Sequence, residues 1–212
     1  MKRILMIVMA ALMAITFSAC GSDAGKAASK EDTDTQKTEA EQPASTTSDQ
    51  ATAKNRILVA YFSCTGNTKA LAETAAGILG ADLYEIRPEQ PYTATDLNYN
   101  DETTRATVEQ KDDSARPALA DKNANIGAYD TIVLAYPIWW GQAPRIIDTF
   151  VESYDFSGKT IVPICTSGGS DIGSSADYLQ KLMKGTANWK NGKRFGGAGE
   201  AEVKNWLDSL ER

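Results

Sequence analysis

The sequence predicts an α/β fold in which helices cover both faces of a parallel β-sheet. Over residues 55–212, apolar runs alternate with amphipathic stretches, and the first run, ILVAYF, is apolar throughout. Loops of unusual composition follow three of these runs. Strands that are buried on both faces are apolar throughout, and strands that alternate with helices typically form parallel sheets. We therefore expect one α/β domain over residues 55–212.

The first strand and helix have the clearest pattern. The run ILVAYF at residues 57–62 is expected to form a strand. In the helix that follows, Leu71, Ala75 and Ile78 recur at helical spacing, and Gly80 stands where glycine commonly ends a helix. We therefore expect a strand, a loop at residues 63–68 and a helix in direct succession.

The remaining elements continue this alternation. A helix is expected over residues 144–154, with Pro144 in its first turn. Its buried stripe is expected to consist of Ile146, Ile147, Phe150 and Val151. Pro163 lacks the amide hydrogen that a central strand uses, so a local bulge is expected there. The other expected elements are strands at 81–86, 130–136 and 160–167, a short fifth strand within 188–195, and helices around 102–111, 178–185 and 200–210.

The first 54 residues are expected to lie outside this domain. Residues 1–19 have the layout of a secretory signal peptide, with two cations, an apolar stretch and small residues before a cysteine. The motif FSAC at residues 17–20 resembles the lipobox of bacterial lipoproteins, which implies that Cys20 is acylated and anchors the chain to the membrane. An uncleaved membrane anchor is the alternative. Residues 20–54 are polar apart from Ala, so they are expected to form a disordered linker that tethers the domain outside the cell.

Charge and composition exclude several functions. The formal net charge of −6 becomes −8 if Lys2 and Arg3 leave with the signal peptide, which disfavours nucleic acid and favours a basic protein partner. The chain has no histidine, which excludes a Ser/His/Asp triad, a histidine-based zinc helix and a histidine proton shuttle. No metal site is expected. Any demanding chemistry must therefore come from a cofactor.

Three loops of unusual composition follow the first, third and fourth expected strands. They are SCTGNT at 63–68, PIWWGQAP at 137–144 and TSGGSDIGSS at 166–175. In an open parallel sheet the ligand binds beyond the carboxyl ends of the strands, where the strand order reverses. Because all three loops belong to that edge, we expect them to form one site.

These loops and their flanking residues resemble one family. The segments YFSCTGNTKALAE, YPIWWGQAPRIIDTF and GKTIVPICTSGGS together are similar to those of flavodoxin-like proteins of bacteria, and the likeness covers most of residues 55–212. The resemblance implies a five-stranded parallel sheet in the order 2-1-3-4-5, with FMN across the ends of strands one, three and four. The implied FMN-binding residues are Ser63, Cys64, Thr65, Gly66, Asn67, Thr68, Pro137, Ile138, Trp139, Trp140, Gly141, Thr166, Ser167, Gly168, Gly169, Ser170, Asp171 and Gly173.

Physical chemistry gives these residues different expected roles. The loop at 63–68 can hold a phosphate without a cation, because backbone amides and hydroxyl groups converge there at the start of a helix. Lys69, the only cation nearby, is expected to point away. Trp139 or Trp140 can stack on the flavin, and only one is expected to touch it, since neighbouring side chains of extended backbone point in opposite directions. Tyr99 either covers the other face of the flavin or is an exposed aromatic residue of the insert.

The third loop is expected to set the redox behaviour of the flavin. The amides of Gly168 and Gly169 are expected to face the polar pyrimidine edge of the flavin. Asp171 is the carboxylate expected to lie near the reduced, negatively charged flavin, so Asp171→Asn should raise its redox potential.

A thiol mechanism is the main competitor of the loop's phosphate-binding role. The segment CTGNTKA resembles the catalytic loop of low-molecular-weight tyrosine phosphatases and arsenate reductases, but it has Ala70 where those proteins have arginine. Without that cation, neither the thiolate nor the transferring phosphoryl group has a charge partner. Cys64 and Cys165 are expected to remain free thiols, because strand three separates the two strands that precede them.

The expected function is that of an FMN redox protein that carries electrons at the outer face of a bacterial membrane. Its partners would then be a redox protein and, through Cys20, the lipid bilayer. Two alternatives remain open at this point. One is an FMN-dependent NAD(P)H oxidoreductase that reduces a quinone or a similar acceptor, and the other is a non-catalytic module that binds a different phosphate compound.

Overall fold

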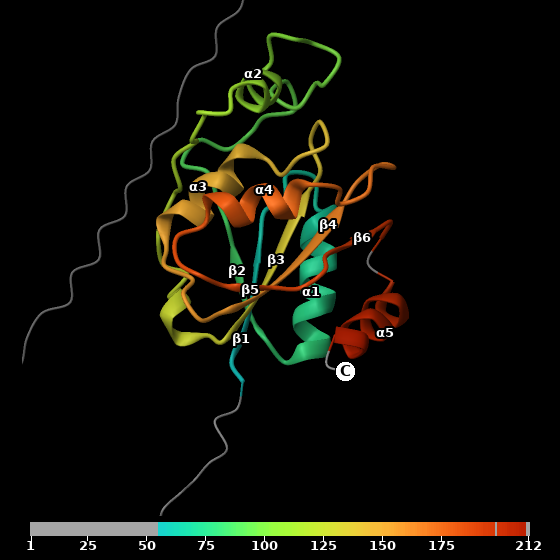
Figure 1. Cartoon of the computed structure of the whole chain (residues 1–212). Helices are drawn as coiled ribbons and strands as arrows, with labels where there is room; N and C mark the ends of the chain where they lie inside the picture. Colours follow the sequence, from blue (N-terminus) through green and yellow to red (C-terminus); the bar gives the residue numbers. More distant parts are fainter. Residues whose placement is uncertain (1–54, 198, 211–212) are drawn as a thin grey trace, which may run out of the picture. The chain divides into compact units, whose positions relative to one another are not determined.

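A parallel β-sheet forms the middle layer of the fold, and helices cover both of its faces (Figure 1). The computed structural model describes residues 55–197 and 199–210. The strand order is β2-β1-β3-β4-β5, as expected, and a further short strand, β6, also pairs with β4. The strands are β1 (Ile57–Tyr61), β2 (Asp82–Glu85), β3 (Thr131–Pro137), β4 (Thr160–Thr166), β5 (Asn188–Trp189) and β6 (Lys193–Phe195).

Two hydrophobic cores lie on opposite faces of the sheet. Side chains of β1 alternate between them: Leu58 and Ala60 belong to one core, and Val59 and Tyr61 belong to the other. Because every second side chain points to the same face, a strand covered on both faces must be apolar at each position. This requirement explains the unbroken apolar run of the first strand.

Different pairs of helices supply the two cores. The first core includes α3 (Arg145–Ser153) and α4 (Ser175–Leu182), and the second includes α1 (Asn67–Leu79) and α5 (Glu200–Leu210). The predicted apolar stripe of α3 is confirmed, since all four of its residues are buried. In α1, Leu71 and Ala75 are fully buried, whereas Ile78 is only partly buried. Gly80 ends α1 with φ 58°, and its amide donates to the carbonyl of Ala76.

A long insert, residues 87–125, separates β2 from β3. It contains the short helix α2 (Arg105–Lys111), which confirms the helix expected around residues 102–111, and it is followed by the 3-10 turn η1 (Ile126–Ala128). Figure 1 shows α2 beyond the end of the sheet at which the site was expected. The insert is therefore placed where it can contribute to a ligand site.

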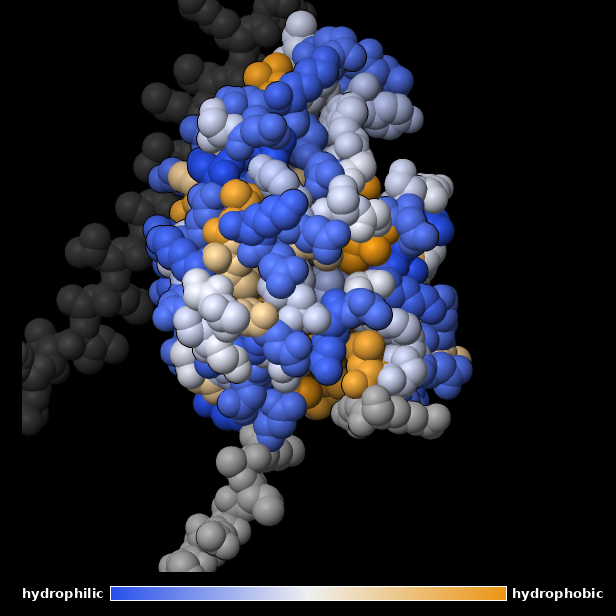
Figure 2. All heavy atoms as spheres, in the orientation of Figure 1, coloured by the Kyte–Doolittle hydropathy of each residue, from blue (hydrophilic) through white to orange (hydrophobic). Residues whose placement is uncertain are grey.

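Some predictions concern residues that the structure does not describe. The signal peptide at 1–19, the acylated Cys20 and the linker to residue 54 all lie outside the described residues. Among the residues that are described, no helix combines the length and the apolar character needed to cross a bilayer. The face of the molecule drawn in Figure 2 is largely hydrophilic, with hydrophobic residues in small separate patches.

The bulge predicted in β4 at Pro163 is wrong, because β3 and β4 pair without interruption from Thr131↔Thr160 to Pro137↔Thr166. The interruption lies on the other side of β4. There β5 pairs with its first residues and β6 with its last, leaving Pro163 between them. The carbonyl of Ile161 accepts from Lys190 on that side at 2.9 Å. Residues two apart in a strand direct their backbone groups to the same neighbouring strand, so Pro163, like Ile161, is directed to the fifth strand. Because proline has no amide hydrogen to donate there, the fifth strand is split into two short pieces.

Gly192 lies in this interruption, close to Pro163. A Cβ atom on Gly192 would lie 2.8 Å from both the Cγ and the carbonyl oxygen of Pro163, and it would also meet the side chain of Ile172. The Gly192→Ala substitution should therefore lower the free energy of unfolding by about 1–3 kcal/mol, the usual effect of overpacking. Urea unfolding measures this change.

Gly77→Ala is the matched control, because Gly77 lies within α1 and a Cβ there would meet nothing within 4 Å. Alanine should stabilise that helix by about 0.5–1 kcal/mol. Equal effects of the two substitutions on stability would contradict the packing of Gly192 against Pro163.

Candidate functional site

A cleft of about 840 Å³ opens at the carboxyl ends of the central strands. Its volume is within the range of sites that hold small molecules and cofactors. Among the described residues, none that lines the cleft carries a charged side chain. The lining residues are Ser63, Cys64, Thr65, Asn67, Thr68, Ala70, Leu97, Tyr99, Ala106, Pro137, Ile138, Trp139, Trp140, Thr166, Ser167, Gly168, Phe195, Gly196 and Gly197.

The loop at 63–68 presents unpaired donors to this cleft. Within the described residues, the amides of Cys64, Thr65, Asn67 and Thr68 have no hydrogen-bond acceptor. Gly66 has φ 89°, a conformation that residues with a Cβ rarely adopt, and its amide donates to the Ser63 hydroxyl at 3.1 Å. Free amides at the start of a helix, together with the positive end of the helix dipole, form a site suited to an anion.

Hydrogen bonds between side chains fix the shape of the loop. The Thr68 and Thr166 hydroxyl groups lie 2.8 Å apart and are buried, so they join the start of α1 to the end of β4. The side-chain amide of Asn67 donates to the Thr65 hydroxyl at 3.2 Å, which leaves the hydrogen of that hydroxyl available to a ligand. Lys69 points away as expected, since its ammonium group pairs with Glu73 at 3.9 Å and it does not line the cleft.

The second loop forms a tight turn that carries both tryptophans. The amide of Trp139 donates to the carbonyl of Gln142 at 2.9 Å, and the reverse bond is 3.0 Å. Both residues between them have positive φ, 48° for Trp140 and 78° for Gly141, as in the type I′ turn of two-residue hairpins. A residue other than glycine in this region costs about 1–2 kcal/mol. Such strain is often found at functional sites.

The turn changes what was expected of the two indoles. Opposite orientations would require extended backbone, and Trp140 is not extended, so both Trp139 and Trp140 line the cleft. Trp139 is held by edge-to-face contacts with Phe62 and Tyr92, at centroid distances of 5.6 and 5.3 Å. Trp140 is 46% exposed. The cleft therefore has one fixed aromatic wall and one exposed aromatic rim.

In the third loop, the Ser167 hydroxyl organises the backbone. It donates to the carbonyl of Ser170, and it accepts from the amide of Gly169 at 3.3 Å and from the guanidinium of Arg194 at 2.9 Å. The amide of Gly169 is therefore engaged within the loop, whereas Gly168 lines the cleft and its amide has no acceptor among the described residues. Of the two glycines expected to face a ligand, only Gly168 is placed to do so.

The structure thus brings together twelve of the eighteen residues expected at the site, and these line the cleft. The six others lie in the same loops but outside the lining: Gly66, Gly141, Gly169, Ser170, Asp171 and Gly173. Tyr99 lines the cleft although it is 71% exposed, so the two interpretations of this residue are compatible.

Several lining residues were not anticipated. Phe195 ends β6, and Gly196 and Gly197 follow it, so small residues again stand at the carboxyl end of a strand, as in the recognised loops at 63–68 and 166–175. Leu97 and Ala106 belong to the insert, and nothing in their local sequence indicates a site. The insert therefore forms a wall of the cleft.

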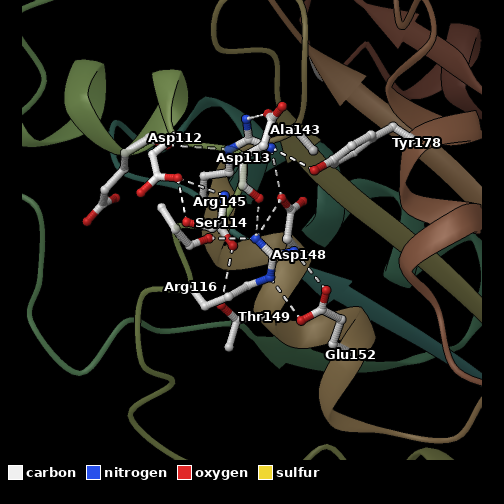
Figure 3. Close-up of polar contacts among 12 residues, drawn as sticks. Asp112, Asp113, Ser114, Arg116, Ala143, Arg145, Asp148, Thr149, Glu152 and Tyr178 are labelled. Carbon is white, nitrogen blue, oxygen red and sulfur yellow. Dashed lines mark hydrogen bonds and ion pairs between the residues drawn. The ribbon is translucent and has the colours of Figure 1, made fainter.

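A buried arginine holds the insert against α3 and α4 (Figure 3). Arg145 is 4% exposed, and its guanidinium donates to Asp148 at 3.1 Å and to the Tyr178 hydroxyl at 3.0 Å. From the insert, it binds the carbonyl of Gln110 at 3.0 Å and the carboxylate of Asp113. Arginine suits such a position, because its planar group offers five donors in a fixed geometry. We call these residues the Arg145 cluster.

Asp148 is the buried carboxylate of this cluster. It is fully buried and its Oδ1 atom has no hydrogen-bond partner among the described residues. Burial raises the pKa of Asp148 from its usual 3.8 to about 6, although Arg145 and Arg116 act in the opposite direction. Removing the carboxylate from water therefore outweighs the attraction of the two arginines.

The state of Cys64 argues against thiol chemistry. Cys64 is exposed as a residue, but partial burial of its thiol raises the thiol's pKa above its usual value, which favours the protonated, poorly nucleophilic form at neutral pH. Ala70, in the position of the missing arginine, lines the cleft and offers no cation. Cys64 and Cys165 are both free thiols, as expected.

Comparisons with known proteins identify relatives of this domain. A family model described as flavodoxin matches residues 56–210. Crystal structures of candidate flavoproteins from Bacteroides eggerthii DSM 20697 and Bacteroides uniformis ATCC 8492 are 47% and 43% identical, each with a TM-score of 0.68. They cover 74% and 73% of this chain, and the alignments span 98% of each relative.

A more distant structure shares the fold. It is a flavoprotein in complex with FMN from Lactobacillus acidophilus NCFM, which is 20% identical, has a TM-score of 0.52, and aligns over 72% of this chain and 99% of its own. The search of functionally curated proteins finds no match.

The pKa of Asp148 generates a prediction about stability. Because its pKa is higher in the folded protein, the folded state holds a proton between about pH 4 and pH 6 that the unfolded chain has released. The free energy of unfolding should therefore fall as the pH rises through this window, by at most about 1.4 kcal/mol per pH unit. Asp148→Asn keeps an acceptor for Arg145 but does not titrate. The difference in stability between wild type and this variant should follow that pH dependence, and a constant difference from pH 4 to pH 7 would contradict it.

Proposed function

The chain belongs to the flavodoxin family of FMN-binding proteins, and on that premise we propose that it carries electrons between redox partners at the outer face of a bacterial membrane. In this proposal FMN occupies the uncharged cleft at the carboxyl ends of β1, β3 and β4. The observation that carries the proposal is the set of unpaired backbone amides at the start of α1, beside an aromatic wall.

The donors at the start of α1 fit the phosphate group of FMN. Four amides without acceptors and the Thr65 hydroxyl belong to residues that line the cleft beside the start of α1, and no carboxylate of the described residues lines it to repel an anion. Hydrogen bonds to a charged acceptor are stronger than those to a neutral one. Ser63 and the Thr68–Thr166 pair hold the loop in this shape. The chain can therefore bind a dianion with uncharged donors, most of them from the main chain.

The aromatic residues of the cleft fit a flat ring system. Trp139 is fixed by Phe62 and Tyr92, and Trp140 and Tyr99 are exposed at the rim, where they can cover a bound ring. Aromatic stacking contributes about 0.5–1.5 kcal/mol beyond the burial of apolar area. Gly168 offers its amide to the polar edge of such a ring.

The residues of the cleft have no acid or base role in this mechanism. FMN, when bound, supplies reversible uptake and release of electrons. The amides at the start of α1 would hold the phosphate of this group, and the aromatic residues that line the cleft would pack on its ring and keep water from part of it. The thiol of Cys64, protonated at neutral pH, takes no part. The acidic net charge favours a basic redox partner.

The membrane location rests on the sequence of the first 54 residues. In the proposal, residues 1–19 direct export, Cys20 carries the lipid, and the linker to residue 54 lets the domain reach partners near the bilayer. A chain of that length spans on the order of 30 Å. Confinement to this distance would raise the local concentration of the carrier beside membrane-bound redox enzymes.

Purified full-length protein should bind one FMN per chain and be yellow, with the absorbance bands of a flavin. It should not oxidise NADH or NADPH in steady state when no other protein is present, because a carrier exchanges electrons with proteins. Uptake of FMN with sustained NADH or NADPH turnover would show that the protein is an FMN-dependent oxidoreductase and not an electron carrier. Absence of FMN uptake would overturn the whole proposal.

A pair of glycine variants localises the binding. Gly66→Ala strains the loop, because φ is 89° there, and should weaken FMN binding roughly tenfold. Gly80→Ala imposes the same kind of strain at the other end of α1, where φ is 58°. It should lower stability and leave the affinity for FMN unchanged.

The lipid anchor has a separate test. In a bacterial host that expresses the full chain, wild type should sediment with membranes and incorporate a labelled fatty acid, whereas Cys20→Ser should do neither. Cys64→Ser is the matched control and should behave as wild type does. Membrane association of Cys20→Ser equal to that of wild type would contradict acylation at Cys20.

A further inference from the structure

Arg194 differs from the other arginines that the structure describes. Among residues 55–197 and 199–210, no carboxylate lies within 4.0 Å of its guanidinium. Each of the other five described arginines has such a partner; they are Arg56, Arg87, Arg105, Arg116 and Arg145. Arg194 is thus a positive charge without a neutralising ion pair in this part of the chain.

This charge is fixed beside the third loop of the cleft. The Nε atom of Arg194 donates to the Ser167 hydroxyl at 2.9 Å, and Nη2 donates to the Ser167 carbonyl at 3.2 Å. Two bonds to one residue hold the planar guanidinium in a defined orientation. Ser167 and its neighbour Gly168 line the cleft.

The strand pairing explains why Arg194 reaches this loop. In the parallel register of β4 and β6, Arg194 lies opposite Cys165, two residues before Ser167. Phe195 is buried in the core formed by α1 and α5, so Arg194, the preceding residue, points to the opposite face of the sheet. The fifth strand is interrupted where it passes Pro163 of β4. β6 begins directly after this interruption, which fixes its register with β4.

Asp171 is the charge that opposes Arg194 in this region. Burial raises the pKa of the buried Cys165 thiol to about 12, with Asp171 acting in the same direction and Arg194 in the other. Both charges are therefore close enough to act on this end of β4. Asp171, however, does not line the cleft and has no ion pair with Arg194 within 4.0 Å. The charge fixed against the lining loop is the positive one.

We propose that Arg194 raises the redox potential of the bound flavin by holding a positive charge behind Ser167 and Gly168. The inference rests on the proposed function, in which this loop faces the polar pyrimidine edge of FMN. Reduction adds two electrons from a redox partner and one proton from solvent, which leaves one additional negative charge on the flavin. A fixed cation near that edge stabilises the reduced form more than the oxidised form.

The test compares the affinities of the two redox states. In Arg194→Gln the affinity for reduced FMN should fall roughly tenfold relative to the affinity for oxidised FMN, which is the size expected for unit charges about 10 Å apart at an effective dielectric of about 20. For a two-electron couple this ratio equals a decrease of about 30 mV in midpoint potential. Spectroscopic titration of the FMN-loaded protein against a dye of known potential measures the shift.

Matched variants separate charge from loop structure. Arg194→Lys keeps the charge but cannot reproduce both hydrogen bonds of the guanidinium to Ser167. The midpoint potential of its bound flavin should stay near that of wild type. Lys159→Gln removes the same charge at the amino end of β4, where Lys159 binds the Gly127 carbonyl at 3.5 Å, and it should leave the potential unchanged. A decrease in Arg194→Lys equal to that in Arg194→Gln would assign Arg194 a purely structural role and overturn the proposal.

Two further outcomes are informative. If wild type binds FMN and Arg194→Gln binds it with an unchanged potential, the inference fails and the proposed function stands; if wild type binds no FMN, both fail. If Arg194→Gln does not fold, Arg194→His offers a second test. Histidine loses its charge near pH 6.5, so a change of pH removes the charge at residue 194 without a further substitution. This variant's potential should fall below that of wild type as the pH rises from 5.5 to 8, and an equal pH dependence of the two proteins would overturn the proposal.

Discussion

The binding of an anion by uncharged main-chain donors is the constraint on which the rest of this structure depends. No charged side chain among residues 55–197 and 199–210 lines the cleft, so in the proposed function the phosphate would be held by the amides at the start of α1 and by the dipole of that helix. These donors are useful only if they converge. Strand β1, buried from Leu58 to Tyr61, the positive φ of Gly66 and the Thr68–Thr166 hydrogen bond hold the loop that carries them.

The opposite wall of the cleft depends on a second polar feature, the Arg145 cluster. The insert packs on the first core through residues such as Tyr92 and Ala124, and α2 and the residues that follow it are also tied through Gln110 and Asp113 to a buried arginine. Hydrogen bonds to a charged group add to this packing in positioning the insert. Leu97, Tyr99 and Ala106 consequently border the cleft, and bound flavin would touch residues from a region of the chain with no binding motif.

The sequence was sufficient for the features that local chemistry determines. Apolar runs and helical spacing predicted the strands, the helices and the strand-end loops, and the family resemblance supplied the strand order. It was insufficient where the outcome depends on neighbouring strands or on backbone torsions. Pro163 was correctly seen as disruptive, but only the register shows that the disruption falls on the fifth strand. The turn at Trp140 breaks the usual preference for glycine or asparagine, so its orientation could not be predicted from side-chain alternation.

The measurement that tests the central claim most directly is calorimetry of FMN and riboflavin binding to the full chain at low and high salt. The two ligands differ only in the phosphate, so uncharged main-chain donors should give FMN roughly a hundredfold or greater advantage, since each hydrogen bond to a charged group contributes about 1.5–3 kcal/mol. The advantage should change less with salt than that of a site built on exposed lysine or arginine side chains, because no ion pair is involved. Equal affinities for FMN and riboflavin would contradict the account.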